Sequence, residues 1–292
     1  MIGLSCVGVI VAACVGDDAG SSGPSANDAA TTPETGTTTP DTGSSTPDTG
    51  TEADAADAAS DAAKRHCETV TKPQAPTEFF CADFDGPDAS EGWTTTLRAD
   101  GGTFALTKEA AVSLPQAFAV QPPNGTGNGS GPALKWTSVG AKNFSRAELR
   151  AQMNPSNAGG VTTYDGDILL LEIRTSNALA AFGYTQGGTV GANTNYKGYF
   201  IRVAAFGGAA IQNVLPVATP LTQATWTDVK FTYDSAGRVV LTYNNVSIFD
   251  QTNYGSTDTK VTFTVGAAAS GQVAEPKQMR YDDVELTLLR QP

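Results

Sequence analysis

The sequence predicts an all-β domain that folds as a two-sheet sandwich. Short segments rich in β-branched and aromatic residues recur from about residue 78 onward, separated by clusters of Gly, Pro, Asn and Asp. No long stretch repeats its apolar residues with the 3.6-residue period of a helix. Ten or more short strands within about 225 residues are typical of a sandwich or barrel.

Eleven segments are predicted to be strands. In Ser145–Met153 polar and apolar residues alternate strictly, which places the two sets on opposite faces of a sheet. Asp228–Tyr243 predicts a hairpin around the four-residue turn Asp234–Gly237. The eleven are Glu78–Phe84, Phe104–Lys108, Gln116–Gln121, Ala133–Trp136, Ser145–Met153, Asp167–Thr175, Gly198–Ala205, Thr225–Tyr233, Val239–Asn244, Val261–Ala267 and Asp282–Leu289.

Residues 1–14 are predicted to be a signal peptide with a lipidation site. Ile2–Ala13 is an unbroken run of apolar or small residues, too short for a membrane-spanning helix but typical of a signal peptide. Val11–Cys14 (VAAC) resembles the bacterial lipobox, in which the Cys is lipidated and becomes the mature N-terminus. We therefore expect a lipid anchor on Cys14 that holds the protein at the bacterial envelope, on the outer membrane or cell surface. Ordinary secretion is the alternative.

Residues 15–66 are predicted to be a disordered linker. The segment consists mainly of Thr, Ser, Gly, Pro, Asp and Ala, and TPDTG occurs at Thr39–Gly43 and Thr46–Gly50. The net charge of −12 belongs mostly to this part, because residues 1–63 hold ten acidic and no basic side chains. From Lys64 onward the charge is 18 − 20 = −2. No basic surface for nucleic acid is expected, and we expect a monomer.

The domain is predicted to span residues 67–292. Cys67 and Cys81 lie at its start, and in an exported protein a disulfide between them is the default. Two free thiols are the alternative.

Three segments of this domain resemble the concanavalin A-like, laminin-G-like jelly roll. They are FFCADFDG at residues 79–86, WTDVKFTYDSAGRVVLTYNNVSIFD at residues 226–250 and MRYDDVELTLL at residues 279–289. The resemblance implies a jelly roll in which an N-terminal strand lies beside the C-terminal strand. That fold hosts lectins, adhesion modules, glycosidases and lyases, so the resemblance indicates the fold more than the function.

The resemblance also implies a structural Ca²⁺ where the first and last strands meet. Asp85, backbone groups near Gly86, and Asp282 or Asp283 are the matching oxygen ligands, and Ca²⁺ takes six to eight of them. The alternative is that Asp282 and Asp283 cap turns or pair with Arg280.

A concave groove is the predicted ligand site. Paired Arg side chains suit acidic sugars or carboxylates, and Tyr rings stack on sugars. The alternative is a solvated sheet face with cross-strand ion pairs. The candidate groove residues are Arg146, Glu148, Arg150 and Gln152 on one strand, Glu172 and Arg174 on the next, and Lys197 and Tyr199 beyond.

Ser145–Arg150 (SRAELR) resembles the R-[ST]-E-L-R motif of alginate-lyase-type jelly rolls. By that resemblance Arg146 or Arg150 neutralises a uronate carboxylate, and Tyr199 acts as base or acid. Where that family has Gln-Ile-His, this sequence has Glu172-Ile173-Arg174, and its one histidine, His66, precedes the predicted domain.

These features favour a cell-surface lipoprotein whose noncatalytic jelly roll binds glycan or another surface polymer. A uronate lyase is the rival prediction, and a structural or adhesive envelope protein is the third.

Overall fold

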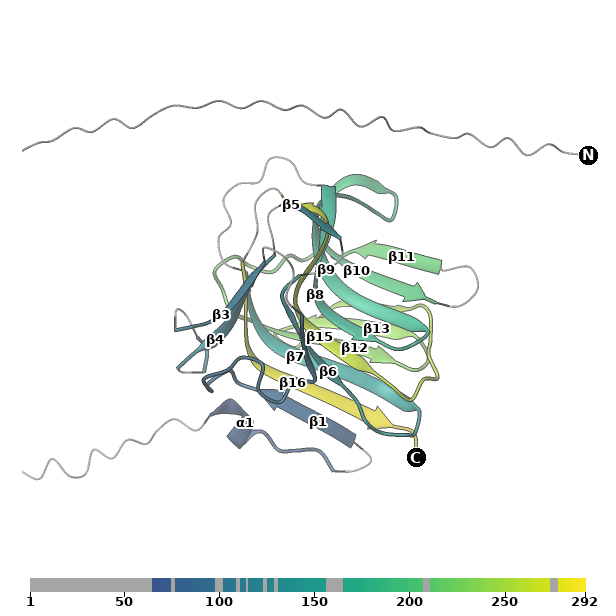
Figure 1. The fold of residues 1–292 in the computed structure, drawn as a ribbon. Helices are drawn as coiled ribbons and strands as arrows, with labels where there is room; N and C mark the ends of the chain where they lie inside the picture. Colours follow the sequence, from purple (N-terminus) through teal and green to yellow (C-terminus); the bar gives the residue numbers. More distant parts are fainter. Residues whose placement is uncertain are drawn as a thin grey trace, which may run out of the picture. The chain divides into compact units, whose positions relative to one another are not determined.

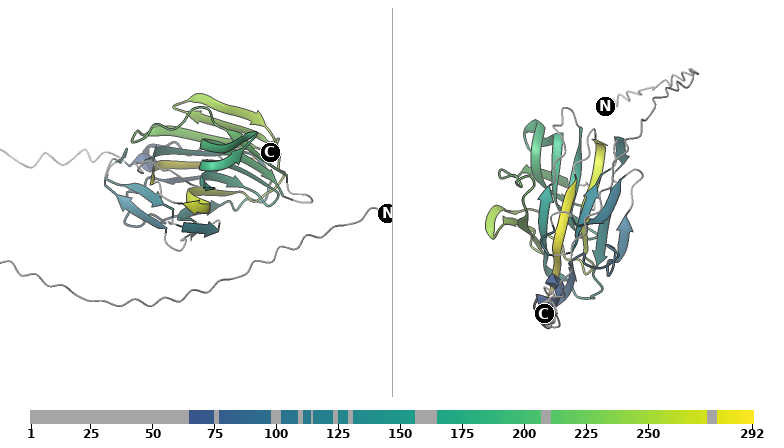
Figure 2. Two further views of the ribbon diagram at one scale, coloured as in Figure 1. Left: turned by 90° about the horizontal axis from the view of Figure 1, so that it is seen from above. Right: turned by 90° about the vertical axis from the view of Figure 1, so that its left-hand side faces the viewer.

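Two antiparallel sheets, stacked as the two layers of a sandwich, make up the structure (Figures 1 and 2). This computed structural model describes residues 65–74, 77–97, 102–108, 111–113, 115–122, 125–128, 131–155, 165–206, 211–273 and 278–292. The predicted signal peptide and all but the last two residues of the predicted linker lie outside the described residues.

Each sheet has eight strands in the described part of the chain. Sheet A runs β14 (Val246–Thr252), β13 (Arg238–Tyr243), β12 (Thr227–Asp234), β7 (Phe144–Pro155), β16 (Met279–Arg290), β4 (Ala117–Gln121), β3 (Thr103–Thr107), with β1 (Thr77–Ala82) also paired to β16. Sheet B runs β11 (Ile211–Pro216), β10 (Asn193–Ala205), β9 (Ala178–Val190), β8 (Asp165–Arg174), β15 (Thr262–Val273), β6 (Ala133–Thr137), β2 (Thr95–Leu97), with β5 (Gly125–Asn128) also paired to β15. The short helix α1 (His66–Thr69) precedes them.

The core lies between the sheets, because alternate residues of each strand point inward. In sheet A, Leu149 lies between Phe231 and Leu286 in the cross-strand register. In sheet B, Ile173 pairs with Phe263. All five side chains are fully buried. The residues between them therefore face outward, and the two outer faces carry the polar side chains available to a ligand.

Tyr281 of β16 joins the two sheets through its hydroxyl. It donates to the carbonyl oxygens of Leu170 (3.2 Å) and Gly266 (2.6 Å), which belong to β8 and β15 of the other sheet. Complete burial raises the pKa of this phenol well above its usual value. A buried hydroxyl with partners on the opposite layer fixes how the sheets stack.

The predicted all-β sandwich is confirmed, and all eleven predicted strands overlap observed ones. The predicted hairpin is present as β12 and β13, and Gly237 at φ +92° donates its N–H to the Asp234 carbonyl at the turn. The prediction missed β2, β5, β9, β11 and β14.

The 13-residue strand β9 was missed because its sequence, ALAAFGYTQGGTV, is rich in Ala and Gly, which strands generally avoid. Large neighbours use the space that these small residues leave. A Cβ on Gly183 would lie 2.7 Å from the ring of Phe200 and 2.6 Å from the carbonyl oxygen of Ile168. The small residue is therefore required where a ring lies flat against the strand.

The N-terminal segment is held to sheet A by a disulfide, by strand pairing and by an ion pair. The predicted Cys67–Cys81 disulfide is confirmed. β1 pairs with β16 from Thr77 opposite Leu289 to Ala82 opposite Val284. Glu78 of β1 also pairs with the buried Arg290 of β16. Within the described ranges, no helix is long and apolar enough to cross a membrane.

Candidate functional site

The predicted groove residues are divided between the two sheets and do not line one groove. Arg146, Glu148, Arg150 and Gln152 lie on β7 in sheet A and point outward. Glu172 and Arg174 lie on β8, which belongs to sheet B, and Lys197 lies on an exposed part of β10. The expectation that β7 and β8 are neighbours is wrong, because the chain crosses from one layer to the other between them.

Tyr199, the predicted base or acid of the lyase alternative, lies in the core. Its ring stacks on Phe182 with centroids 5.4 Å apart, and its side chain is 7 % exposed. Burial raises the pKa of its phenol far above the usual value. Tyr199 therefore does not share a surface with Arg146 and Arg150, and the structure does not bring these three residues together.

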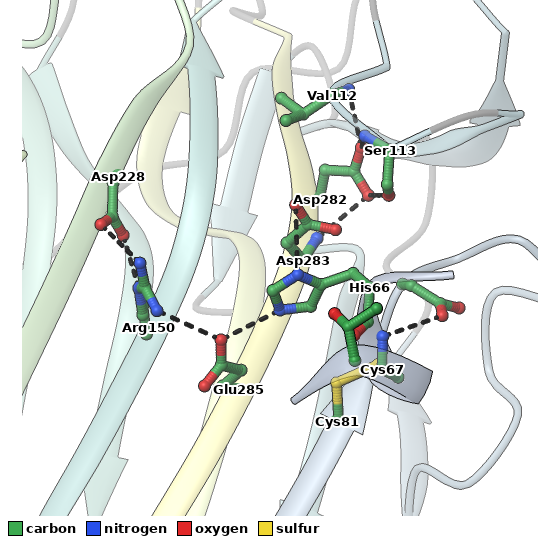
Figure 3. Close-up of polar contacts among 12 residues, drawn as sticks. His66, Cys67, Cys81, Val112, Ser113, Arg150, Asp228, Asp282, Asp283 and Glu285 are labelled. Atoms are coloured by element: carbon green, nitrogen blue, oxygen red, sulfur yellow. Dashed lines mark hydrogen bonds and ion pairs between the residues drawn. A yellow bond between two sulfur atoms is a disulfide. The ribbon is translucent and has the colours of Figure 1, made fainter. Parts of the chain in front are cut away.

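The outer face of sheet A carries a ladder of ion pairs (Figure 3). Arg150 donates two hydrogen bonds to Asp228, at 2.8 and 2.9 Å, and a longer one to Glu285. Glu285 in turn lies 2.9 Å from His66, which the sequence placed outside the domain. The hydrogen bonds to Asp228 raise the pKa of Arg150, so its charge is fixed. This is the cross-strand ion-pair arrangement that the sequence left open as the alternative to a groove.

Asp282 lies where β16 meets the segment that precedes β4, and it is fully buried. Its carboxylate accepts hydrogen bonds from the backbone N–H groups of Val112 and Ser113, from the Ser113 hydroxyl and from the Asp283 N–H (Figure 3). Burial and the neighbouring Asp283 nevertheless raise the pKa of Asp282 to about 7. Asp282 thus acts as an internal acceptor that ties two segments together.

The acidic residues predicted to bind calcium, Asp85 with Asp282 or Asp283, differ in how their carboxylates are engaged. Among the described residues, no group of three or more His, Cys, Asp or Glu side chains is placed to hold a metal ion. Asp282 is occupied by the four donors above. Asp85 differs, because both of its oxygens are buried without a hydrogen-bond partner, as is Oδ1 of Asp283. Burial raises the pKa of both carboxyls.

The outer face of sheet B has a buried carboxylate at its centre. Glu172 is only 8 % exposed although it points away from the core. The register places it in one cross-strand row with Ala181 and Arg202 on one side and Thr264 and Lys135 on the other. Arg174, two residues along β8, lies 3.9 Å from the carboxylate.

Charges of opposite sign meet at Glu172. Burial raises the pKa of its carboxyl, while Arg174, Lys135, the Thr264 hydroxyl and Arg202 act against the rise, in that order. Three cations around one carboxylate leave an excess of positive charge at the centre of this face. Such a group can hold an anionic ligand by charge-assisted hydrogen bonds.

Apolar side chains lie beside this charged centre. Leu179, Ala181 and Ala204 form a small cluster on the outer face, and Leu169 and Phe206 pack against it. The guanidinium of Arg174 lies over the Phe206 ring, 5.0 Å from its centroid. Apolar side chains beside a few charged groups are a combination that ligand sites commonly use.

Of these residues, Glu172 and Arg174 are predicted from the sequence, whereas Lys135, Thr264 and Arg202 are not. Their signal was present, since each alternates with core residues in its own strand. What was missing was the strand order, which places β9 and β15 directly beside β8, with β10 and β6 one strand further out.

No protein-family model and no curated protein matches the chain. Among solved structures, the cellulose-induced protein Cip1 has a TM-score of 0.49 and 13 % identity, covering 71 % of this chain and 96 % of that one. Endo-β-1,4-glucuronan lyase from the fungus Trichoderma reesei has a TM-score of 0.48 and 11 % identity, and the match covers 68 % of this chain and 92 % of the lyase chain. Alginate lyase Aly36B has a TM-score of 0.42 and 11 % identity, and the match covers 66 % of this chain and 89 % of the Aly36B chain.

Proposed function

We propose that this domain is a noncatalytic module that binds an acidic glycan or a similar anionic surface polymer on the outer face of sheet B. The observation that carries the proposal is the nearly buried Glu172 with Arg174, Lys135 and Arg202 around it. A buried charge of this kind is costly to desolvate unless opposite charges and hydrogen-bond donors lie around it, as they do here. Here the carboxylate orients cations whose remaining N–H donors suit a carboxylate or sulfate on a sugar.

A uronate lyase is the rival function. Its chemistry needs a proton acceptor and a proton donor beside the neutralised sugar carboxylate. The residues that the lyase-like motif supplies are separated, because Tyr199 packs in the core and Arg150 is engaged with Asp228 and Glu285. The placement of these residues favours binding over cleavage.

The binding proposal predicts changes of opposite sign on one face. Arg202→Gln and Lys135→Gln should each weaken binding of polygalacturonate about tenfold, because each removes a charge-assisted contact. Glu172→Gln should strengthen it, because the amide keeps the shape of the side chain and one acceptor oxygen for the cations while a negative charge beside the ligand is removed. Acidification should act in the same direction, since burial raises the pKa of Glu172 and so favours its neutral form. Affinity electrophoresis measures all four effects.

Lys72→Gln is the matched control, because Lys72 is exposed in the N-terminal segment. It should bind as the unchanged protein does. Equal affinity in the Arg202, Lys135 and Glu172 variants would contradict the proposed face. Release of unsaturated products from the polymer, followed by ultraviolet absorbance, would favour the lyase instead.

We also propose that Ca²⁺ binds near Asp85 and Asp283, with backbone carbonyls completing its ligands. Their buried oxygens without hydrogen-bond partners support this. Calcium should then raise the melting temperature relative to a chelator, and Asp85→Asn should remove most of the difference. Equal melting temperatures after verified metal removal would exclude the site.

The proposed location of the protein rests on the sequence alone. We propose that residues 1–13 are removed, that the lipidated Cys14 becomes the mature N-terminus, and that residues 15–66 serve as a spacer between membrane and domain. Mass spectrometry of the mature N-terminal peptide should find a diacylglyceryl group on Cys14. An unmodified N-terminus at another residue would indicate ordinary secretion.

A further inference from the structure

A hollow of about 220 Å³ lies on the outer face of sheet A, on the opposite side of the sandwich from Glu172. It lies over β7, β12 and β13. Three cationic side chains line it, one from each strand: Arg146, Lys230 and Arg238. The function proposed above uses none of them.

The register explains how the hollow forms. Thr232 of β12 pairs with the short Val240 of β13, while Lys230 pairs with Thr242 one step further along the same face. Small side chains thus lie at the centre of the hollow, and longer ones rise around them. Thr232 is 7 % exposed, which places it at the bottom.

The two arginines are held in place by acids beside the hollow. Arg146 donates from Nη2 to Glu148 (2.7 Å), and Arg238 donates from Nε and Nη2 to Asp250 (2.8 and 2.6 Å). Each guanidinium has five N–H groups, so donors remain on both. The acids therefore orient these side chains without using up their donors.

Lys230 and Thr242 add donors that have no acceptor. Among the described residues, the Lys230 ammonium has no ion-pair or hydrogen-bond partner, and the Thr242 hydroxyl is buried without one. Buried polar atoms are normally paired with protein, water or a ligand. An acceptor that reaches both groups would complete the hollow.

We propose that this hollow binds a tetrahedral oxyanion, the sulfate or phosphate group of a ligand. Three cationic side chains approach it from three strands and the Thr242 hydroxyl adds a further donor, so a group with acceptor oxygens in several directions fits better than a planar carboxylate. Asp234, which also lines the hollow and accepts the Arg238 backbone N–H, limits it to a single anionic group. The domain would then have a charged binding site on each outer face.

Sulfate titration followed by amide NMR at constant ionic strength tests the proposal. Amides of β12 and β13 around Thr232 and Val240 should show chemical-shift changes that saturate with inorganic sulfate. Lys230→Gln should raise the dissociation constant about tenfold. Thr242→Val keeps the shape of the side chain, removes the hydroxyl, and should also weaken binding. Parallel titrations with phosphate and acetate distinguish the anions, and acetate should bind worst.

Two controls separate this site from the rest of the surface. Lys260→Gln changes an exposed lysine outside the hollow and should bind sulfate unchanged. As the second control, only the amides of β12 and β13 are scored, so that sulfate held on sheet B does not count and failure of the sheet B proposal does not affect this one. Shifts that never saturate, or an unchanged dissociation constant in Lys230→Gln, would overturn the proposal.

Discussion

Replacing Asp282 by alanine is expected to lower the free energy of unfolding by about 3 kcal/mol, because it leaves several buried hydrogen-bond donors without an acceptor. The N–H groups of Val112 and Ser113 lie 2.9 and 3.0 Å from Oδ2, and the Ser113 hydroxyl lies 3.0 Å from Oδ1. None of these donors regains an acceptor from an alanine side chain. Urea unfolding followed by tryptophan fluorescence measures the loss.

Asp282 should also make the stability of the protein depend on pH in a defined direction. The pKa of Asp282 is raised to about 7 from an ordinary 3.8, so the folded state retains a proton that the unfolded state has released. This group therefore makes the protein less stable as pH rises from about 4 to about 7. The unchanged protein should lose stability over that interval, and Asp282→Ala should lose less.

Two variants set the scale for this result. Ser113→Ala removes only the hydroxyl donor and should cost about 1 kcal/mol. Asp250→Ala removes a solvent-exposed carboxylate that pairs with Arg238 and should cost less than that. If Asp282→Ala were as mild as Asp250→Ala, the four hydrogen bonds would not be important for stability.

Removal of the Cys67–Cys81 disulfide is expected to have a similarly large effect. The bond closes a loop with a sequence separation of 14, for which the chain-entropy model gives about 3 kcal/mol. A Cys67→Ser/Cys81→Ser double variant should therefore unfold at a clearly lower urea concentration. In this variant α1 should also be held less firmly against sheet A, since without the disulfide its attachment would depend on the contacts of His66 with Glu285 and Asp283.

Hydrogen exchange provides the structural measurement. Amides of α1 and the start of β1 should exchange faster in the double variant. The exchange rates of amides in β12 should change only as far as the global stability changes. The unchanged protein in reductant should match the double variant. Unaltered stability after verified reduction of the bond would contradict the expected contribution.

The sequence predicts the fold well where side chains alternate. Ser145–Met153 and Asp228–Tyr243 carry a clear period of two, and both are confirmed as β7 and the β12–β13 hairpin. β9 carries no such signal, because Ala and Gly lie where the ring of Phe200 needs room. That requirement comes from another strand and cannot be read locally.

The candidate site was less predictable for a topological reason. Local alternation correctly places Arg146 and Arg150 on an outer face, and likewise Glu172 and Arg174. It does not say that β7 and β8 belong to different layers. The row from Lys135 to Arg202 is assembled from five strands, two of them preceding β9 and two following it, and only the sheet order brings it together.

The disulfide also determines where mechanical load would enter the domain. Tension on the chain ahead of Arg65 would pass from Cys67 directly to Cys81, so residues 68–80 would carry none of it. The pull would act on β1 at the residue opposite Glu285, next to the last pair of the strand, rather than at Thr77. The pairs from Thr77 to Phe80 would therefore not be peeled open one after another from the strand's free end. With the membrane anchor proposed above, a polymer that pulls on the domain would load its first strand at Cys81 rather than at Thr77 for as long as this one covalent bond stays oxidised.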